Sequence, residues 1–359
     1  MTLEFNWCAP VSGDGHQLGL PAWERPPSLE GSIAIFQAAE RNGFRYLLVG
    51  MGFDNHVLEA WTLATAVLAR TERIGAMIAV RPGFFNTAVL AKMVTTLDHL
   101  TGGGRVSLNV VSGGRPREQA MFGDFVEHDA RYRRTAEFME AARRLWTELE
   151  PFNYAGEFHD LRQTRLERLP LTPEGPPFYF GGASPIAERV AADHADVYLL
   201  WGETLAQTKE RIAKMSFLLA QNGRLGMVRF GVRINVIARP TETEALEAAR
   251  HLIAPIPLKK LENARNRELT NTERDSVGQK RQWDLLRQAD DDLFIEPHLW
   301  TGIAVVRSGA GMAIVGSYQQ VADRLQAYAD LGVSVFILSG YPHLEECENV
   351  GKNVIPLLR

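Results

Sequence analysis

Short apolar runs alternate with amphipathic stretches along the whole chain. Eight of these runs have the length and the near-continuous apolar character of strands that are buried on both faces. The expected strands are residues 3–9, 46–50, 74–80, 106–111, 178–180, 197–200, 230–238 and 333–338. An alternation of this kind predicts an α/β fold with a parallel sheet.

Between the expected strands, apolar positions recur with the 3.6-residue period of a helix. The expected helices are residues 33–42, 58–70, 87–100, 132–149, 186–194, 205–222, 245–253 and 319–331. Eight strands that alternate with helices favour a closed (β/α)8 barrel, the TIM barrel, over an open doubly wound sheet. We therefore expect one TIM-barrel domain over residues 1–359.

Two segments interrupt the alternation. Residues 152–161 predict a small β excursion after the fourth helix. Residues 255–297 are polar, charged and flanked by prolines, and they are too long for a plain loop, so we expect a partly helical insertion after strand seven. Because loops after barrel strands cover the active site, we favour a lid here over a solvent-exposed decoration.

Composition narrows the class of protein. The chain is 45% hydrophobic and 23% charged, which is typical of a globular protein, and its net charge of -4 argues against a nucleic-acid partner. No apolar run approaches the roughly 20 residues that cross a bilayer, and the first residues lack the basic region of a signal peptide. We expect a cytoplasmic protein without a membrane partner.

The two cysteines, Cys8 and Cys347, fit neither a metal-ligand spacing nor a disulfide framework, so no metal site is expected. The sequence also lacks a nucleophile elbow and a GxGxxG fingerprint. Without an obvious protein nucleophile, the reactive atom is expected to belong to a cofactor.

Polar side chains follow several of the expected strands at their carboxyl ends, which form the active-site face of a barrel. Tyr341 and His343 follow the last strand, with Pro342 between them to restrict the backbone. Taken alone, His343 is equally well explained as a turn histidine with satisfied hydrogen bonds. Five other strands end in similar polar segments, near residues 11–16, 81–82, 109–114, 201–203 and 233–235. Their convergence on one rim predicts a site.

Two arginines stand among apolar or small residues. Arg233 lies in Gly-Val-Arg-Ile, and Arg307 precedes Ser-Gly-Ala-Gly. A guanidinium in such surroundings needs an anionic partner, and its fork matches two oxygens of a carboxylate, phosphate or sulfonate.

A second pattern is typical of phosphate binding. Residues 181–184, Gly-Gly-Ala-Ser, follow the fifth strand and open a helix whose N–H groups suit a phosphate, although an ordinary helix entry has the same pattern. His128 and Tyr132 lie four residues apart and would share a helix face. An exposed capping pair is the alternative for these two residues.

Six segments resemble the alkanesulfonate monooxygenases, a branch of the bacterial luciferase-like flavin-dependent barrels. They are residues 13–16, 179–184, 198–203, 275–279, 299–311 and 339–346, in order over nearly the whole chain. The resemblance implies a two-component enzyme in which a separate NAD(P)H-dependent flavin reductase supplies FMN as FMNH2. With O2, the enzyme would cleave the C–S bond of an organosulfonate and release sulfite and an aldehyde.

The resemblance also implies roles for individual residues. The catalytic and substrate positions would be Arg233, Arg307, Tyr341 and His343. The FMN site would be His128, Tyr132, Gly182, Ala183 and Ser184, with Asn109 and Ser112 near the flavin. Trp201 would form a wall of the pocket.

The chain departs from the family pattern at three places. Ser12 and Asn235 replace histidines, and residues 53–57, which include Asn55 and His56, replace a stretch that carries a cysteine. Neutral polar groups at these positions favour a polar organosulfonate, for instance a sulfosugar such as sulfoquinovose, over a plain alkanesulfonate. Ser12, His56, Trp201 and Asn235 are therefore the expected substrate-binding residues.

Other functions stay open at this point. Within the same superfamily, the chain could oxidise a sulfone or a molecule without sulfur, or act as a deazaflavin-linked dehydrogenase. From another class, it could be a catalytically silent flavin-binding protein. Because luciferase-like barrels associate through their helices, we expect a homodimer or a homotetramer.

Overall fold

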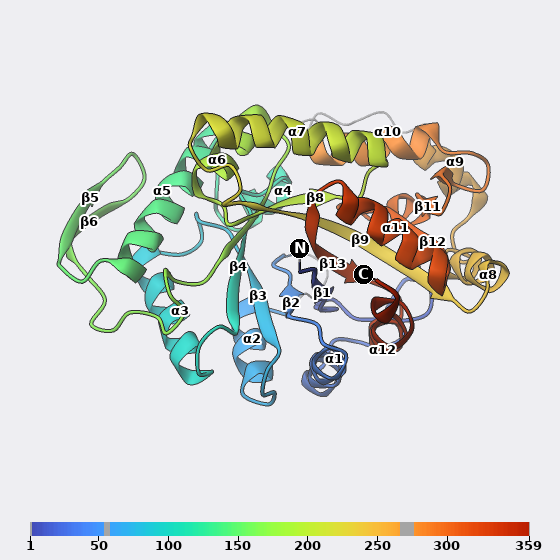
Figure 1. Cartoon of the computed structure of the whole chain (residues 1–359), viewed down its shortest axis with the longest axis horizontal. Helices are drawn as coiled ribbons and strands as arrows, with labels where there is room; N and C mark the ends of the chain where they lie inside the picture. The colour runs from blue at the N-terminus through green and yellow to red at the C-terminus, as the bar shows by residue number, and fades with distance from the viewer. Residues whose placement is uncertain (1, 54–57, 266–275, 359) are drawn as a thin grey trace.

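The computed structural model describes residues 2–53, 58–265 and 276–358, and eight parallel strands form a closed barrel at its centre (Figure 1). Pairing of the first with the last of these strands, and of the sixth with the seventh, closes the ring. The barrel strands are β1 (Glu4–Cys8), β2 (Tyr46–Val49), β3 (Gly75–Val80), β4 (Val106–Val110), β7 (Phe178–Gly181), β8 (Val197–Trp201), β9 (Arg229–Arg239) and β13 (Val333–Ser339). The predicted fold class and all eight predicted strands are confirmed.

Helices surround the barrel, as Figure 1 shows. The helices that the periodicity predicted are α1 (Leu29–Arg41), α2 (Ala60–Leu68), α3 (Thr87–Leu100), α5 (His128–Thr147), α6 (Pro185–His194), α7 (Leu205–Gln221), α8 (Glu242–Leu252) and α11 (Tyr318–Asp330), and α12 (His343–Asn353) follows the last strand. Several begin at a side-chain cap, such as Thr204 before α7 and Ser317 before α11. Helix α4 (Pro116–Met121) was not predicted, because six residues are too few for a periodic pattern.

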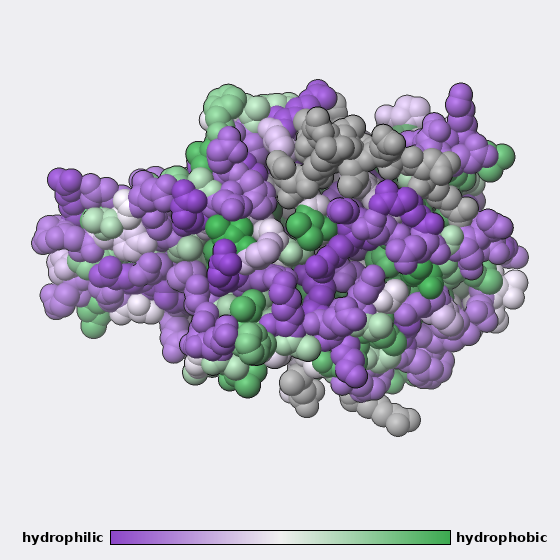
Figure 2. Space-filling model, turned by 90° about the horizontal axis from the view of Figure 1, so that it is seen from above, coloured by the Kyte–Doolittle hydropathy of each residue, from purple (hydrophilic) through white to green (hydrophobic). Residues whose placement is uncertain are grey.

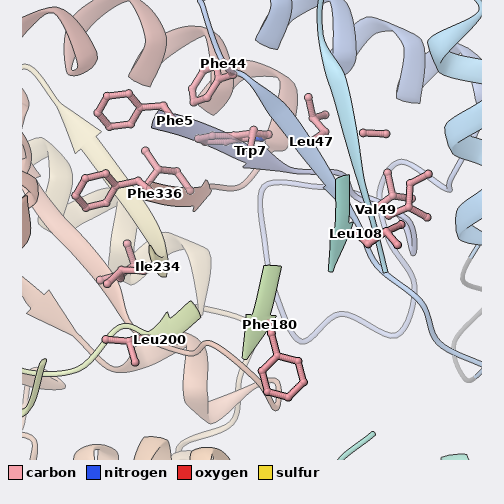
Figure 3. Close-up of a cluster of buried hydrophobic side chains, with 14 of the residues drawn as sticks. Phe5, Trp7, Phe44, Leu47, Val49, Leu108, Phe180, Leu200, Ile234 and Phe336 are labelled. Carbon is pink, nitrogen blue, oxygen red and sulfur yellow. The ribbon is translucent and has the colours of Figure 1, made fainter. Parts of the chain in front are cut away.

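The barrel strands separate two hydrophobic layers. Alternate side chains point outward against the helices, and those between them point into the barrel. Figure 3 shows members of the outer layer: Phe5, Trp7, Phe44, Leu47, Val49, Leu108, Phe180, Leu200, Ile234 and Phe336. Since Leu108 and Ile234 face outward, the same alternation turns their neighbours Asn109 and Arg233 inward. The strand register thus brings two of the predicted site residues to the interior of the barrel.

Two additions extend the barrel. The predicted β excursion is confirmed as a hairpin of β5 (Phe152–Ala155) and β6 (Asp160–Thr164), which projects at the left of Figure 1. Strands β10 (Phe294–Glu296), β11 (Leu299–Trp300) and β12 (Ala313–Ser317) extend the sheet from β9 and were not predicted. They are short, and β12 joins the sheet along the far end of β9, at Asn235–Arg239, while its other edge pairs with β11.

The insertion after strand seven is partly helical, as predicted, with α9 (Leu258–Arg265) and α10 (Val277–Gln288). Residues 266–275 of the insertion lie outside the described residues. Helix α10 is hydrogen-bonded to the rim of the barrel. The Gln282 side chain donates to the Gly202 carbonyl at 2.9 Å and accepts from the Gly311 N–H at 2.9 Å, and Gln279 accepts from the Gly309 N–H at 2.7 Å. Helix α10 therefore holds the loop that carries Arg307, while closure of the insertion as a lid stays a prediction.

The molecular surface seen in Figure 2 is mostly hydrophilic, with small separate hydrophobic patches. Among the residues that the structure describes, no helix is long and apolar enough to cross a membrane. This finding agrees with the absence of long apolar runs in the sequence.

Candidate active site

A cavity of about 1180 Å³ opens at the carboxyl ends of the barrel strands. Cys8, Leu48 and Ala79 reach it from β1, β2 and β3, and the loop of residues 9–27 that follows β1 lines one side. Residues from the ends of β4, β9 and β13 complete it. This is the face at which TIM-barrel enzymes place their active sites.

The four predicted catalytic residues all line this cavity. The Arg307 guanidinium donates a hydrogen bond to the Tyr341 hydroxyl. The Tyr341 and His343 rings are nearly perpendicular, with centroids 5.0 Å apart. Arg233 enters from the inner face of β9. Residues from three distant segments therefore meet at one place, although their catalytic role stays a prediction.

The charged side chains that line the cavity are all positive. Its described lining contains five cationic side chains and no carboxylate; the cations are Arg81, Arg115, Arg233, Lys260 and Arg307. Glu118, which is buried behind the wall, pairs with Arg81 at 2.5 Å and with Arg115 at 3.1 Å. In the described part of the chain, neither Arg233 nor Arg307 forms an ion pair with a carboxylate. The cavity is therefore suited to an anionic ligand.

His343 is a neutral imidazole in this environment. Its side chain is buried, and burial lowers the pKa of His343 to about 3, with the charge of Arg307 as the second cause. Among the described residues, Nδ1 has no hydrogen-bond partner.

Asp14 fixes the position of His343. Its Oδ2 accepts a hydrogen bond from the His343 backbone N–H at 2.7 Å, and its Oδ1 accepts from the Gly15 N–H at 2.9 Å. Burial raises the pKa of the Asp14 carboxyl to about 6. The Gly-Asp-Gly-His segment at residues 13–16 therefore holds the N-terminus of α12 in place.

The predicted phosphate-binding residues gather at the N-terminus of α6. The Ser184 hydroxyl caps this helix by accepting from the Ala187 N–H at 3.4 Å, and it also lies beside the Tyr132 hydroxyl. The His128 ring packs edge-on to the Tyr132 ring, with the ring centroids 5.0 Å apart. Its Nδ1 also lies 2.7 Å from the Asp129 carboxylate. This cluster is not merely an exposed capping pair, because it includes the turn that opens α6.

Close packing at Gly182 supports the fit of a phosphate. A Cβ atom there would lie 2.5 Å from the Ala187 Cβ and 3.5 Å from the Tyr132 hydroxyl, so the turn needs glycine. Ala183 follows in the same turn. Pro185 has no N–H and the Ala187 N–H donates to Ser184, so an anion at this turn would meet the Ile186 N–H of α6 and the hydroxyl groups of Ser184 and Tyr132. The residues present therefore suit the phosphate of FMN.

Of the remaining predicted residues, some line the cavity and others lie outside its lining. Asn109 and Ser12 line the cavity. Ser112 is buried outside its lining, with Oγ 2.9 Å from the Thr135 hydroxyl. Trp201 also lies outside the lining and packs against Gly278 of α10, where an added Cβ would be 3.3 Å from the indole. His56 and Asn55 fall outside the described residues.

Asn235 requires a correction, because its amide is already occupied. It donates to the Ala310 and Met312 carbonyls at 3.1 and 3.0 Å and accepts from the Ser339 hydroxyl at 2.6 Å. Only 2% of Asn235 is exposed, and it does not line the cavity. It anchors the loop after Arg307 and does not form a substrate wall.

Sequence reasoning missed several lining residues. Arg81 directly follows β3, and the alternation of side chains along that strand places it on the inner face, so the sequence pattern alone could have indicated it. Its guanidinium donates to Glu118 and, at 3.0 Å, to Gln119. Trp23 lies in a segment without a strand pattern, so no sequence signal predicted it, and Lys260 was covered only by the expectation that residues 255–297 lie over the active site. Among the described residues, no cluster of His, Cys, Asp or Glu could hold a metal ion.

Comparison with known proteins defines the class. The family model of luciferase-like monooxygenases matches residues 3–334, and the chain belongs to this family. The resemblance inferred from the sequence is therefore confirmed at the level of the family.

Solved structures show the same fold at low identity. A riboflavin lyase with modified FMN and riboflavin is 17% identical, with a TM-score of 0.78, and the match covers 99% of this chain and 91% of that chain. An EDTA monooxygenase from Chelativorans sp. BNC1 is 18% identical, with a TM-score of 0.78 and coverages of 99% and 93%. A long-chain alkane monooxygenase is 19% identical, with a TM-score of 0.76 and coverages of 100% and 93%.

Proposed function

We propose that this protein is an FMNH2-dependent monooxygenase that uses O2 to cleave the C–S bond of an organosulfonate. The family supports the monooxygenase reaction. The observation that carries the choice of substrate is the pair Arg233 and Arg307, which line a cavity that has no carboxylate in its described lining. A sulfonate supplies the anionic partner that these two guanidinium groups lack.

The surrounding groups suit a sulfonate. Because the Tyr341 hydroxyl accepts a hydrogen bond from Arg307, its own proton is free to donate to a sulfonate oxygen. His343 is neutral and adds no charge to the cavity that it lines. Arg233 would then bind the anion from the β9 side of the cavity.

The flavin would be held mainly by the second cluster. Gly182, Ala183 and Ser184 would bind the FMN phosphate, with His128 and Tyr132 beside them. Asn109 would face the flavin from β4, and Ser112 would support that strand end from behind. A likeness of fold to a riboflavin lyase that holds modified FMN supports this assignment. We further propose that a separate NAD(P)H-dependent reductase delivers the FMN already reduced.

The overall reaction balances as follows. Reduced FMN supplies two electrons when it is bound; one atom of O2 ends in water and the other in the aldehyde. The sulfonate loses its C–S bond, sulfite leaves, and one proton is released. Arg233 and Arg307 would stabilise the negative charge on the departing sulfite, and the buried site would exclude water.

The identity of the sulfonate is proposed more narrowly. Ser12, Gln17 and Asn109 line the cavity with polar groups that can bind hydroxyls, and a sulfosugar such as sulfoquinovose is the first substrate to test. Asn235 gives no support to this choice, because its amide is occupied. A site that hydrogen-bonds substrate hydroxyls can reject an analogue that lacks them by several orders of magnitude.

Sulfite release tests the proposed function. The wild-type protein is supplied with FMN, a flavin reductase and NAD(P)H, and it is offered sulfoquinovose, short alkanesulfonates and octanesulfonate in one panel. Sulfite from any of them supports the reaction, and faster turnover of sulfoquinovose than of octanesulfonate supports the sulfosugar. Absence of sulfite with every sulfonate contradicts the proposed function and favours a sulfone, a substrate without sulfur, a deazaflavin-linked dehydrogenase or a catalytically silent flavin-binding protein.

A further inference from the structure

The loop of residues 9–27, which follows β1, faces the cavity with a largely apolar surface. The residues that line the cavity from this loop include Val11, Leu18, Leu20, Pro21, Ala22, Trp23, Pro26 and Pro27. Arg307 and Arg233 lie on other segments, after η1 (Gly302–Val305) and in β9. The cavity therefore has a cationic part and an apolar part, which is the division that an organic anion requires.

Trp23 is the part of this loop that comes next to the anion site. Its ring is stacked on the Tyr341 ring, with centroids 6.2 Å apart and an angle of 8° between the planes. The Tyr341 hydroxyl in turn accepts from Arg307. A sulfonate bound at Arg307 and Tyr341 would thus have its carbon framework close to the indole.

Gly13 holds the indole in position. A Cβ atom on Gly13 would lie 2.6 Å from Trp23 Cγ, and Gly13 has a φ of +122°, a conformation that other residues rarely adopt. The indole therefore packs directly on the backbone at residue 13. Such packing leaves the ring little freedom to move aside for a larger ligand.

The ends of the loop are tied down on both sides of Trp23. Asp14 and Arg25 exchange two backbone hydrogen bonds of 2.9 Å. The Arg25 guanidinium also forms a bidentate ion pair with the Glu345 carboxylate of α12, with N–O distances of 2.6 and 2.9 Å. Asp14 also binds the His343 N–H. Trp23 is therefore positioned before any ligand binds.

We propose that Trp23 is the specificity-determining residue of the substrate site. This inference rests on the proposed sulfonate reaction and names the part of the substrate that the protein selects. The carbon framework next to the sulfonate lies against the indole through its C–H groups, as the C–H face of a sugar ring or a chain of three or more carbons can do. Methanesulfonate is too small to make this contact.

The test compares substrates of different size in Trp23→Ala and Trp23→Phe. We expect Trp23→Ala to raise KM for sulfoquinovose and for a longer alkanesulfonate by about tenfold or more, while kcat changes little, because the contact is present in both the ground state and the transition state. The loss for methanesulfonate should be much smaller than for the larger substrates, and Trp23→Phe should recover part of the loss for the larger substrates. Gly13→Ala, which displaces the indole, should give the same dependence on size.

Binding without turnover provides a second measurement. Calorimetric titration of the sulfonates into protein with oxidised FMN and no reductant should show the same size-dependent loss in Trp23→Ala. Phe217→Ala, which removes a 63% exposed aromatic ring from α7, is the control and should match the wild type.

The outcomes separate the two hypotheses. If the wild type releases no sulfite from any sulfonate, the proposed function fails, and this inference fails with it. If the wild type releases sulfite but Trp23→Ala weakens all sulfonates equally, or none, the proposed function stands and the role of Trp23 is overturned.

Discussion

The Asp14 carboxylate accepts a hydrogen bond of 2.7 Å from the backbone N–H of His343, 329 residues further along the chain. This contact joins the loop after the first barrel strand to the first turn of the last helix. The loop carries Ser12 and Trp23, and the turn carries Tyr341 and His343, so one carboxylate aligns two walls of the candidate active site.

The carboxyl group of Asp14 should make stability depend on pH. Burial raises its pKa from 3.8 to about 6, so the folded state binds more protons than the unfolded state between these values. The raised pKa therefore contributes up to about 3 kcal/mol to the unfolding free energy below pH 4, and this contribution is lost as the pH rises through 6. In Asp14→Asn this loss should be absent.

Urea denaturation at pH 4, 5, 6 and 7 measures the effect. The unfolding free energy of the wild type relative to Asp14→Asn should fall over this range. Asp323→Asn, an exposed change, is the control. A difference between wild type and Asp14→Asn that does not vary with pH would contradict the prediction.

Loss of either cavity arginine should impair the proposed reaction. Arg233→Ala or Arg307→Ala leaves a desolvated sulfonate half-paired, which costs about 3 kcal/mol and lowers kcat/KM about a hundredfold or more. Arg307→Lys should recover part of the activity, because it keeps the charge without the fork. Steady-state sulfite release measures this, with exposed Arg73→Ala as control. Wild-type kinetics in both alanine variants would remove the sulfonate assignment.

The flavin-phosphate cluster can be tested without turnover. Tyr132→Phe combined with Ser184→Ala removes the two hydroxyls beside the first turn of α6. Anaerobic titration with FMNH2 should show binding weakened about tenfold or more, as expected for the loss of at least one hydrogen bond to a charged group. FMNH2 should also bind the wild type more tightly than oxidised FMN does.

The matched control for the flavin titration is Tyr154→Phe. Tyr154 lies in β5 of the hairpin, and its hydroxyl donates to Glu140 of α5 at 3.0 Å, away from the turn that opens α6, so FMNH2 affinity should not change. If the double variant binds FMNH2 as tightly as this control does, the phosphate lies elsewhere.

Asn235 should matter for stability and not for substrate choice. Asn235→Ala leaves the buried Ala310 carbonyl without its donor and the Ser339 hydroxyl without its acceptor, which should lower the unfolding free energy by about 2–4 kcal/mol. The Met312 carbonyl keeps the backbone N–H of residue 235 as a donor. Thermal or urea unfolding measures the loss. The preference between sulfoquinovose and octanesulfonate should stay as in the wild type, and a changed preference would show that Asn235 reaches the substrate.

The sequence alone determined the barrel and much of its active face. Strands that are buried on both faces appear in the sequence as continuous apolar runs. For β1 and β13, the predicted strand ends agree with the observed ends within a residue or two. The polar end of the fourth strand also indicated Asn109, and apolar neighbours indicated Arg233; in the structure, the alternation of side chains along each strand turns both inward. The residue pattern also indicated Arg307, Tyr341 and His343, to which the family resemblance added expected roles, and all three line the cavity.

Only the tertiary structure decided which polar groups are free to meet a substrate. Asn235 has the inward position that the pattern indicates, yet a loop more than seventy residues later occupies its amide. Trp23 lies in a loop without periodicity and gains its place by stacking on Tyr341, at the other end of the chain. Local sequence patterns report the strand or helix to which a residue belongs. They carry no information on contacts between distant segments, and such contacts set the shape of this cavity.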